Sequence, residues 1–146
     1  MSTLEDVVKA NSRSVCATGP EATVLSAVQQ MCRFHVRALL VGDLADPIGI
    51  ISERDILERV VLANLDPKAT CVGTVMTTPL VLLPASSSPS EALEFMRHHR
   101  LHQIPILSEE AVTGVVSSTD LLRWAEGSLK YEVRRLTEYC SGKYPG

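Results

Sequence analysis

The sequence predicts an α/β protein made of two similar halves, and three observations support this fold class. A heptapeptide at residues 49–55, Gly-Ile-Ile-Ser-Glu-Arg-Asp, returns 65 residues later at 114–120 as Gly-Val-Val-Ser-Ser-Thr-Asp. Each copy joins a short apolar strand pattern to an apolar helical pattern. The 65-residue offset also pairs Met31 with Met96, without a gap from the first helix of the repeat to the last. A unit of this size rarely closes a core alone, so we expect two βαββα halves packed face to face about a pseudo-twofold axis.

The elements of the first half follow from apolar spacing and turn residues. In order, we expect a short helix with Leu4, Val7 and Val8, a brief strand at 15–17, a helix from Thr23, strands at 37–41 and 48–51, and a helix after Ser52 that ends near 64–67. The helix from Thr23 rests on Leu25, Val28, Met31 and Cys32, which recur at helical spacing. The turn at 42–47 contains Gly, Asp and Pro, which favour tight turns.

The second half repeats this order and is followed by a further helix. We expect a strand at 80–83, a helix at 90–100, a strand at 104–107 and a strand entering the helix after Ser117. The predicted divisions are an N-terminal segment (1–8), a first repeat (9–66), a linker (67–79), a second repeat (80–126) and a C-terminal amphipathic helix with a tail (127–146). That helix carries an apolar stripe of Leu129, Val133, Leu136 and Cys140, and it could dock on its own domain or on a partner.

Composition narrows the function classes. The net charge of −3 and an aromatic content of 4% argue against nucleic acid as the main partner. No apolar run approaches the roughly 20 residues of a membrane span, and the first residues lack the pattern of a signal peptide. We therefore expect a cytoplasmic protein whose scattered cysteines stay reduced: Cys16, Cys32, Cys71 and Cys140.

The duplicated motif has two physical interpretations. Ser52 and Ser117 stand at helix N-cap positions, with Asp55 and Asp120 at the third helical position. This arrangement is close to a capping box, in which serine and carboxylate satisfy free backbone donors. A helix N-terminus also attracts phosphate, and a nearby carboxylate can accept hydrogen bonds from ribose hydroxyls. The motif therefore predicts either helix capping alone or a nucleotide cradle that occurs twice.

Other candidate chemistry is weaker. The run at 97–102 reads as a basic helix end, although His102 or Arg100 could lie near a ligand phosphate. His98 and His102 are four residues apart, but no third metal ligand accompanies them, so we predict no metal site. No nucleophile with a matching base can be named, and we expect no enzyme activity. Trp124 fits a core anchor as well as an interface, while the overall apolar excess favours a homodimer.

The order of elements, with two Gly-h-h-Ser-x-x-Asp motifs (h, apolar) around the Val-Met-Thr-Thr-Pro linker at 75–79, resembles a tandem pair of CBS domains (cystathionine β-synthase domains, the Bateman module). The resemblance covers roughly residues 9–126. The tail at 136–145 is similar to the ending of short stand-alone bacterial CBS-pair proteins. One departure is Leu40, which stands where the second half has the family's strand proline, Pro105.

The resemblance implies a regulatory module with no required cofactor and with an adenosine nucleotide as its regulatory ligand. It would bind an adenosine-containing ligand (AMP, ADP, ATP or S-adenosylmethionine) in clefts between the halves and signal to a separate regulated protein. It assigns the ribose to Asp55 and Asp120, ribose or phosphate to Ser52 and Ser117, phosphates to Arg37 and His102, and the adenine pockets to Val15, Cys16, Leu80 and Val81, with Ala38 and Gln103 nearby. The alternative is a purely structural dimerisation module whose Ser-x-x-Asp pairs only cap helices.

Overall fold

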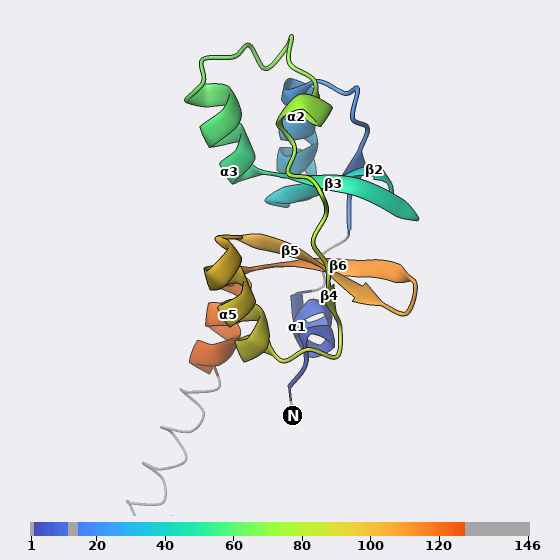
Figure 1. Ribbon diagram of the computed structural model, residues 1–146, viewed down its shortest axis with the longest axis vertical. Helices are drawn as coiled ribbons and strands as arrows, with labels where there is room; N and C mark the ends of the chain where they lie inside the picture. Colours follow the sequence, from blue (N-terminus) through green and yellow to red (C-terminus); the bar gives the residue numbers. More distant parts are fainter. Residues whose placement is uncertain (1, 12–14, 128–146) are drawn as a thin grey trace, which may run out of the picture.

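The computed structural model describes residues 2–11 and 15–127 and contains two three-stranded sheets. The sheets face each other at the centre of the molecule, and helices cover their outer faces (Figure 1). This arrangement confirms the predicted α/β class with two halves. The C-terminal amphipathic helix expected beyond residue 127 lies outside the described residues.

The first sheet has the order β1-β2-β3. Its half comprises β1 (Ala17–Thr18), α2 (Val24–Phe34), β2 (Ala38–Asp43), β3 (Asp46–Ser52), α3 (Glu53–Ile56) and the π-helical turn η1 (Leu57–Val61). Strand β1 runs parallel to β2, and β2 pairs with β3 in antiparallel register from Ala38↔Ser52 onward.

The second sheet has the matching order β4-β5-β6. Its half comprises β4 (Leu83–Pro84), α5 (Pro89–His99), β5 (Gln103–Ser108) and β6 (Ala111–Ser117), followed by helical residues 118–127. The strand expected at 80–83 is much shorter, because β4 pairs with β5 only at Leu83 and Pro84.

Corresponding residues begin and end the long helices of the two halves. Thr23 caps α2 by accepting a hydrogen bond from the Ser26 amide (3.1 Å), and Ser88 caps α5 through the Glu91 amide (3.1 Å). A serine or threonine oxygen here satisfies a backbone donor that the helix itself cannot. His35 and Arg100 end the helices in the left-handed conformation, with φ of 54° and 55°. The chain then turns sharply into β2 and β5.

Each half has its own apolar core, but each core is completed by a helix that precedes the other half in the chain. Leu4 and Val7 of α1 (Leu4–Asn11) are buried in the core of the second half. Val72 and Val75 of α4 (Val72–Val75) are buried in the core of the first half. The two helices therefore cross over, and α1 is an integral part of the second half's core rather than a separate N-terminal segment.

The first residue of each motif is glycine because a crossing segment passes directly over it. A Cβ on Gly49 would lie 2.8 Å from both the Met76 sulfur and the Thr77 carbonyl oxygen. A Cβ on Gly114 would lie 2.7 Å from a methyl group of Val8. Met76 thus corresponds in space to Val8, at an offset of 68 residues and not 65. The gap-free offset holds within the repeats and fails in the crossing helices, because α1 runs three residues past Val8.

The helix after the first motif leaves apolar side chains outside the core. Val60 is buried, but Leu57, Val61 and Leu62 are 60%, 65% and 81% exposed. Trp124, by contrast, is partly buried and packs against the second core. Within the described part of the chain, no helix is both long enough and apolar enough to cross a membrane.

Candidate functional site

Both motif turns form the capping arrangement predicted from the sequence. The Ser52 amide donates to Asp55 Oδ2 (2.9 Å) and the Asp55 amide donates to Ser52 Oγ (3.3 Å). The same pair of bonds joins Ser117 and Asp120, at 2.9 and 3.0 Å. Each carboxylate is buried, since Asp55 is 8% exposed and Asp120 is 5% exposed. The two motifs thus fix the start of the following helix in each half.

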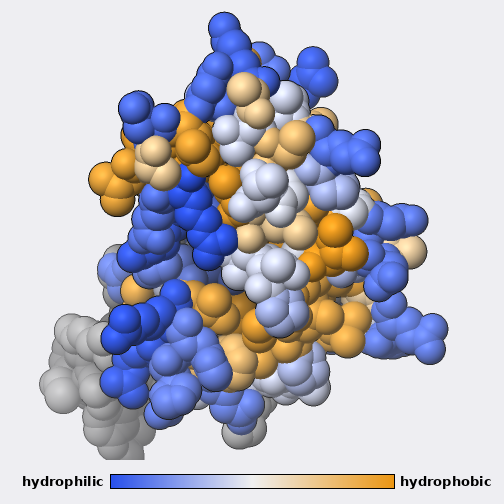
Figure 2. All heavy atoms as spheres, turned by 45° about the horizontal axis from the view of Figure 1, so that its top comes forward, coloured by the Kyte–Doolittle hydropathy of each residue, from blue (hydrophilic) through white to orange (hydrophobic). Residues whose placement is uncertain are grey.

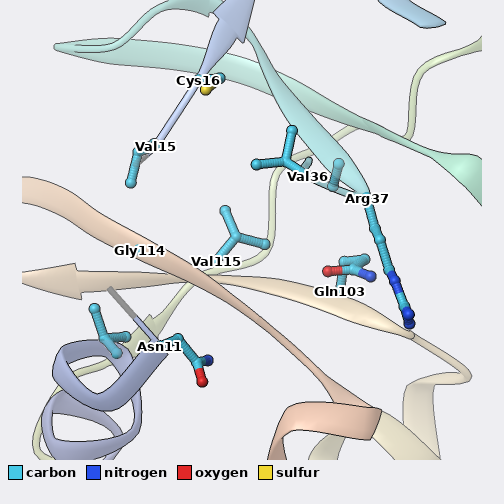
Figure 3. Close-up of a pocket in the computed structure, with 10 residues that line it drawn as sticks. Asn11, Val15, Cys16, Val36, Arg37, Gln103, Gly114 and Val115 are labelled. Atoms are coloured by element: carbon cyan, nitrogen blue, oxygen red, sulfur yellow. The ribbon is translucent and has the colours of Figure 1, made fainter. Parts of the chain in front are cut away.

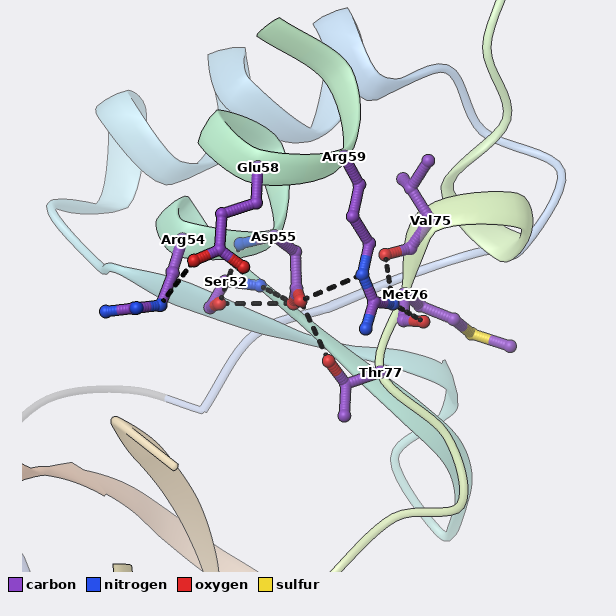
Figure 4. Close-up of polar contacts among 8 residues, drawn as sticks. All are labelled: Ser52, Arg54, Asp55, Glu58, Arg59, Val75, Met76 and Thr77. Carbon is purple, nitrogen blue, oxygen red and sulfur yellow. Dashed lines mark hydrogen bonds and ion pairs between the residues drawn. The ribbon is translucent and has the colours of Figure 1, made fainter. Parts of the chain in front are cut away.

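The linker between the halves is tied to the first of these carboxylates (Figure 4). The Thr77 hydroxyl donates to Asp55 Oδ1 (2.8 Å), while the Ser52 hydroxyl donates to Oδ2 (3.1 Å). Arg59 lies 4.0 Å from Oδ1 and also donates to the Met76 carbonyl (2.8 Å). Both oxygens of Asp55 therefore accept protein hydrogen bonds, so a ribose at this turn has to share them or displace Thr77.

A groove of about 240 Å³ lies between the two halves, where their motif turns approach each other. Its lining includes Arg37 and Arg54 from the first half, His102 and Gln103 from the second, and residues 52–53 and 117–119 at the two helix starts. Arg54 Nη1 lies 2.7 Å from His102 Nε2, so the halves touch across the groove. The groove thus brings two guanidinium groups and an imidazole to one place, which is the chemistry that recognises an anion.

A narrower cavity adjoins the groove and shares Arg37 and Gln103 with it (Figure 3). Val15, Cys16 and Ala38 line it from the first half, and Gly114 and Val115 from the second. Its volume of about 30 Å³ is close to that of a single water molecule. Burial raises the pKa of the Cys16 thiol.

The structure gathers most of the predicted site residues around these two hollows. Val15, Cys16, Arg37, Ala38 and Gln103 line the cavity, and Arg37, Ser52, His102, Gln103 and Ser117 line the groove. Asp55 and Asp120 lie within the turns that carry Ser52 and Ser117. Leu80 instead lines a third hollow between the hairpin ends, with Leu44 and Leu107. Val81 is half-buried in the approach to β4.

Several lining residues were not predicted. Arg54, Ser118 and Thr119 stand inside the two motifs, at positions between the serine and the aspartate that face outward at a helix start. Asn11 lines the cavity from the end of α1. His98 and His102, considered above as a metal pair, have different neighbours: the His98 ring lies 5.0 Å from His99, and His102 contacts Arg54.

Comparison with known proteins agrees with this architecture. The family model for the CBS domain matches the chain twice, at residues 4–62 and 72–127. The mitochondrial CBS domain-containing protein CBSX3 of Arabidopsis thaliana is 31% identical over 97% of this chain and 73% of its own length. Hypoxic response protein 1 of Mycobacterium tuberculosis is 29% identical over 84% of this chain and 85% of its own.

A solved structure shares both fold and sequence. The CBS-domain protein of Burkholderia ambifaria superposes with a TM-score of 0.78 at 31% identity, covering 85% of this chain and 93% of that one. The two family matches coincide with the two halves described above, and each includes the crossing helix that precedes its repeat. The chain therefore belongs to the CBS domain family and contains two tandem copies of that domain.

Proposed function

We propose that this protein is a regulatory module that binds an adenosine-containing nucleotide between its two CBS repeats and signals its occupancy to a partner protein. The observation that carries the proposal is the convergence of Arg37, Arg54 and His102 on one groove that continues into the cavity beside Val15 and Cys16. A polar, cationic end beside an apolar end matches a molecule with phosphate at one side and a base at the other.

The charges of the groove favour a phosphate-bearing ligand. Within the described residues, no hydrogen bond or ion pair engages the Arg37 guanidinium, whereas Arg54 is held by Glu58 (2.8 Å) and His102. One guanidinium group can donate two parallel hydrogen bonds to the oxygens of a phosphate. S-adenosylmethionine carries a cationic sulfonium in place of phosphates, so AMP, ADP and ATP suit this groove better.

The small volume of the cavity suggests that ligand binding is coupled to the separation of the two repeats. A space of about 30 Å³ is far too small for a purine, so the ligand has to widen the gap between the repeats. A ligand that binds the wider form better shifts the population toward it. That shift is the signal that we propose a partner protein reads.

A structural dimerisation module is the second candidate, and the capping bonds of both motifs favour it. The carboxylate of Asp55 is already engaged by Ser52, Thr77 and Arg59 of the same chain. Leu57, Val61 and Leu62 also leave an apolar surface on one helix, suited to a second copy of the chain. We include a homodimer in the proposal, because a regulatory role and a dimer are compatible. Among the described residues, Cys16, Cys32 and Cys71 form no disulfide, which suits the reducing cytoplasm.

A thermal-shift series with AMP, ADP, ATP, adenosine and S-adenosylmethionine tests the proposal. A ligand at 100 times its dissociation constant adds about 2.7 kcal/mol to the free energy of unfolding. We expect the phosphorylated ligands to raise the melting temperature more than adenosine does. If none of the five ligands shifts the transition at millimolar concentration, the nucleotide function is wrong and the structural candidate stands.

A further inference from the structure

The side chain of Asn11 presents a buried hydrogen-bond donor that the protein leaves unused. Its Nδ2 atom is shielded from solvent, and no acceptor within residues 2–11 and 15–127 lies within hydrogen-bonding distance. Buried polar groups in folded proteins almost always have partners, so an exception calls for an explanation. Asn11 also lines the cavity between the repeats.

Backbone conformation does not explain an asparagine here. Asparagine is favoured where a helix ends in the left-handed conformation, and Asn64 serves in this way with a φ of 58°. Asn11 ends α1, but its φ is not positive. The amide therefore has neither a conformational role nor a hydrogen bond to stabilise the protein without ligand.

Core packing does not explain Asn11 either, because it lies on an extension that the other crossing helix lacks. Leu4 and Val7 enter one core as Val72 and Val75 enter the other. Val8 covers Gly114 as Met76 covers Gly49. Helix α4 ends at Val75, whereas α1 continues past Val8 to Asn11. The extra residues add an amide at the cavity wall without adding to either core.

The position of Asn11 suits a contact with the base of a bound nucleotide. Figure 3 shows Asn11 and Cys16 at opposite ends of the cavity, with Val15 and Val115 between them. The valine side chains provide apolar surfaces for a flat heteroaromatic ring, while Arg37 and Gln103 connect the cavity to the cationic groove. A ring nitrogen at the edge of the adenine would supply the acceptor that Nδ2 lacks.

We propose that Asn11 is a specificity-determining residue of this cleft, and that its amide donates a hydrogen bond to an acceptor on the edge of the bound base. This inference rests on the nucleotide binding proposed above. It makes the two clefts of the protein chemically unequal, because the 68-residue offset that pairs Val8 with Met76 places Pro79 opposite Asn11, and a proline side chain has no hydrogen-bonding group. The cleft beside Val15 therefore discriminates among bases more strongly than the other.

Asn11→Leu tests the inference, since leucine has nearly the same shape and no hydrogen-bonding group. We expect the variant to melt at a higher temperature than the parent without ligand, because an unpaired buried donor has been removed. Its affinity for AMP should fall about tenfold, the usual effect of losing one hydrogen bond and leaving its partner unpaired. Ala10→Leu, on the exposed side of the same turn, is the matched control and should leave affinity unchanged.

Titration calorimetry with 1-deaza, 3-deaza and 7-deaza AMP identifies the acceptor. The parent should lose about tenfold for one analogue, and Asn11→Leu should bind that analogue as well as it binds AMP. If Asn11→Leu binds AMP as tightly as the parent while Asp120→Asn loses binding, the inference is wrong and the proposed function stands. If the parent binds no adenosine nucleotide, both fall.

A second variant separates a loss of the proposed contact from a loss of folding. Asn11→Ser keeps a small polar side chain and should also weaken AMP binding. If both Asn11→Leu and Asn11→Ser melt at lower temperatures than the ligand-free parent, the amide is already paired in the protein, and that result overturns the inference.

Discussion

Arg54 and His102 meet across the boundary between the repeats, with Arg54 Nη1 2.7 Å from His102 Nε2. The contact has no equivalent on the other side of the pseudo-twofold axis. The 65-residue offset places Thr119 opposite Arg54 and Arg37 opposite His102, and a threonine is too short to reproduce the contact. One side of the groove is therefore closed by a contact between the repeats, and the other side keeps Arg37 for an incoming anion.

Replacing Arg37 should weaken the binding of phosphate in particular. We expect Arg37→Ala to reduce the affinity for AMP about tenfold, because a charge-assisted hydrogen bond contributes roughly 1.5–3 kcal/mol, and to leave adenosine unaffected. Arg54→Ala should have a smaller effect, since Arg54 is already held by Glu58. Calorimetry with AMP and adenosine measures both. Arg33→Ala removes an exposed charge on α2 and is the control; equal losses for AMP and adenosine in Arg37→Ala would contradict the assignment.

Asp120→Asn separates ribose binding from helix capping. The asparagine keeps an oxygen for the Ser117 amide, so the variant should stay folded. It removes a charged acceptor, and we expect AMP affinity to fall at least tenfold. At Asp55, a ribose has to share or displace the hydrogen bonds from Thr77 and Ser52. A variant of Asp120 that loses stability yet binds AMP like the parent would show that this carboxylate only caps its helix.

The stability lost on replacing Gly114 should be recovered by a second substitution, whereas the stability lost on replacing Gly49 should not. We expect Gly114→Ala to destabilise the protein by about 1–3 kcal/mol through overpacking against Val8, and Val8→Ala to restore much of that loss. Gly49→Ala meets the Thr77 backbone carbonyl as well as Met76, so Met76→Ala should not restore it. Urea denaturation of the single and double variants measures these free energies, and equal rescue in both pairs would be the contrary result.

The thiol of Cys16 should report on the cavity. Burial raises its pKa, and the thiolate is the reactive form, so iodoacetamide should label Cys16 more slowly than the exposed Cys32 and Cys71 at pH 8. The difference should narrow as the pH rises and the Cys16 thiolate forms. AMP should slow the labelling of Cys16 and leave Cys32 unchanged, as peptide mass mapping would show. Equal rates for Cys16 and Cys32 would mean that the cavity is open to reagent.

The exposed apolar side chains of Leu57 and Val61 on η1, and of Leu62 directly after it, predict self-association. Leu62, 81% exposed, is the best place to interrupt a contact without disturbing a core. We expect light scattering to give the parent the mass of two chains and Leu62→Glu the mass of one, with unchanged circular dichroism. Figure 2 shows one face of the molecule, on which apolar surface is gathered in patches between polar regions. A parent of single-chain mass at micromolar concentration would remove the dimer from the proposal.

The duplicated motif made the fold predictable, because two strand-to-helix turns with one offset require two similar halves. It did not reveal that α1 completes the core of the second half. Apolar spacing marks the face of a helix that is buried, but Leu4 and Val7 would give the same pattern on either core. Gly49 and Gly114 could be recognised as motif residues. Glycine is needed there because Met76 and Val8 pass close by, and this close passage depends on the crossing of α1 and α4 between the halves.

The candidate site was predictable to a similar degree. The resemblance to tandem CBS domains assigned Arg37, His102 and Gln103 to the region between the repeats, and the structure places them at the starts of β2 and β5, beside the groove. The contact of Arg54 with His102 could not be predicted from the sequence, since it depends on how the two repeats pack against each other. Asn11 is an unremarkable helix-end residue in the sequence, and its importance appears only when the hydrogen-bond partners of its amide are sought.

The crossing of α1 also has a consequence for the order in which the parts of the protein can fold during synthesis. During synthesis α1 leaves the ribosome before either repeat, yet the residues on which it packs, from Ala85 to Leu121, are made only after the first repeat and the linker. The core of the first half likewise waits for Val72 and Val75. Neither repeat can finish folding from its own stretch of chain, so Leu4 and Val7 stay exposed to chaperones until the second repeat emerges.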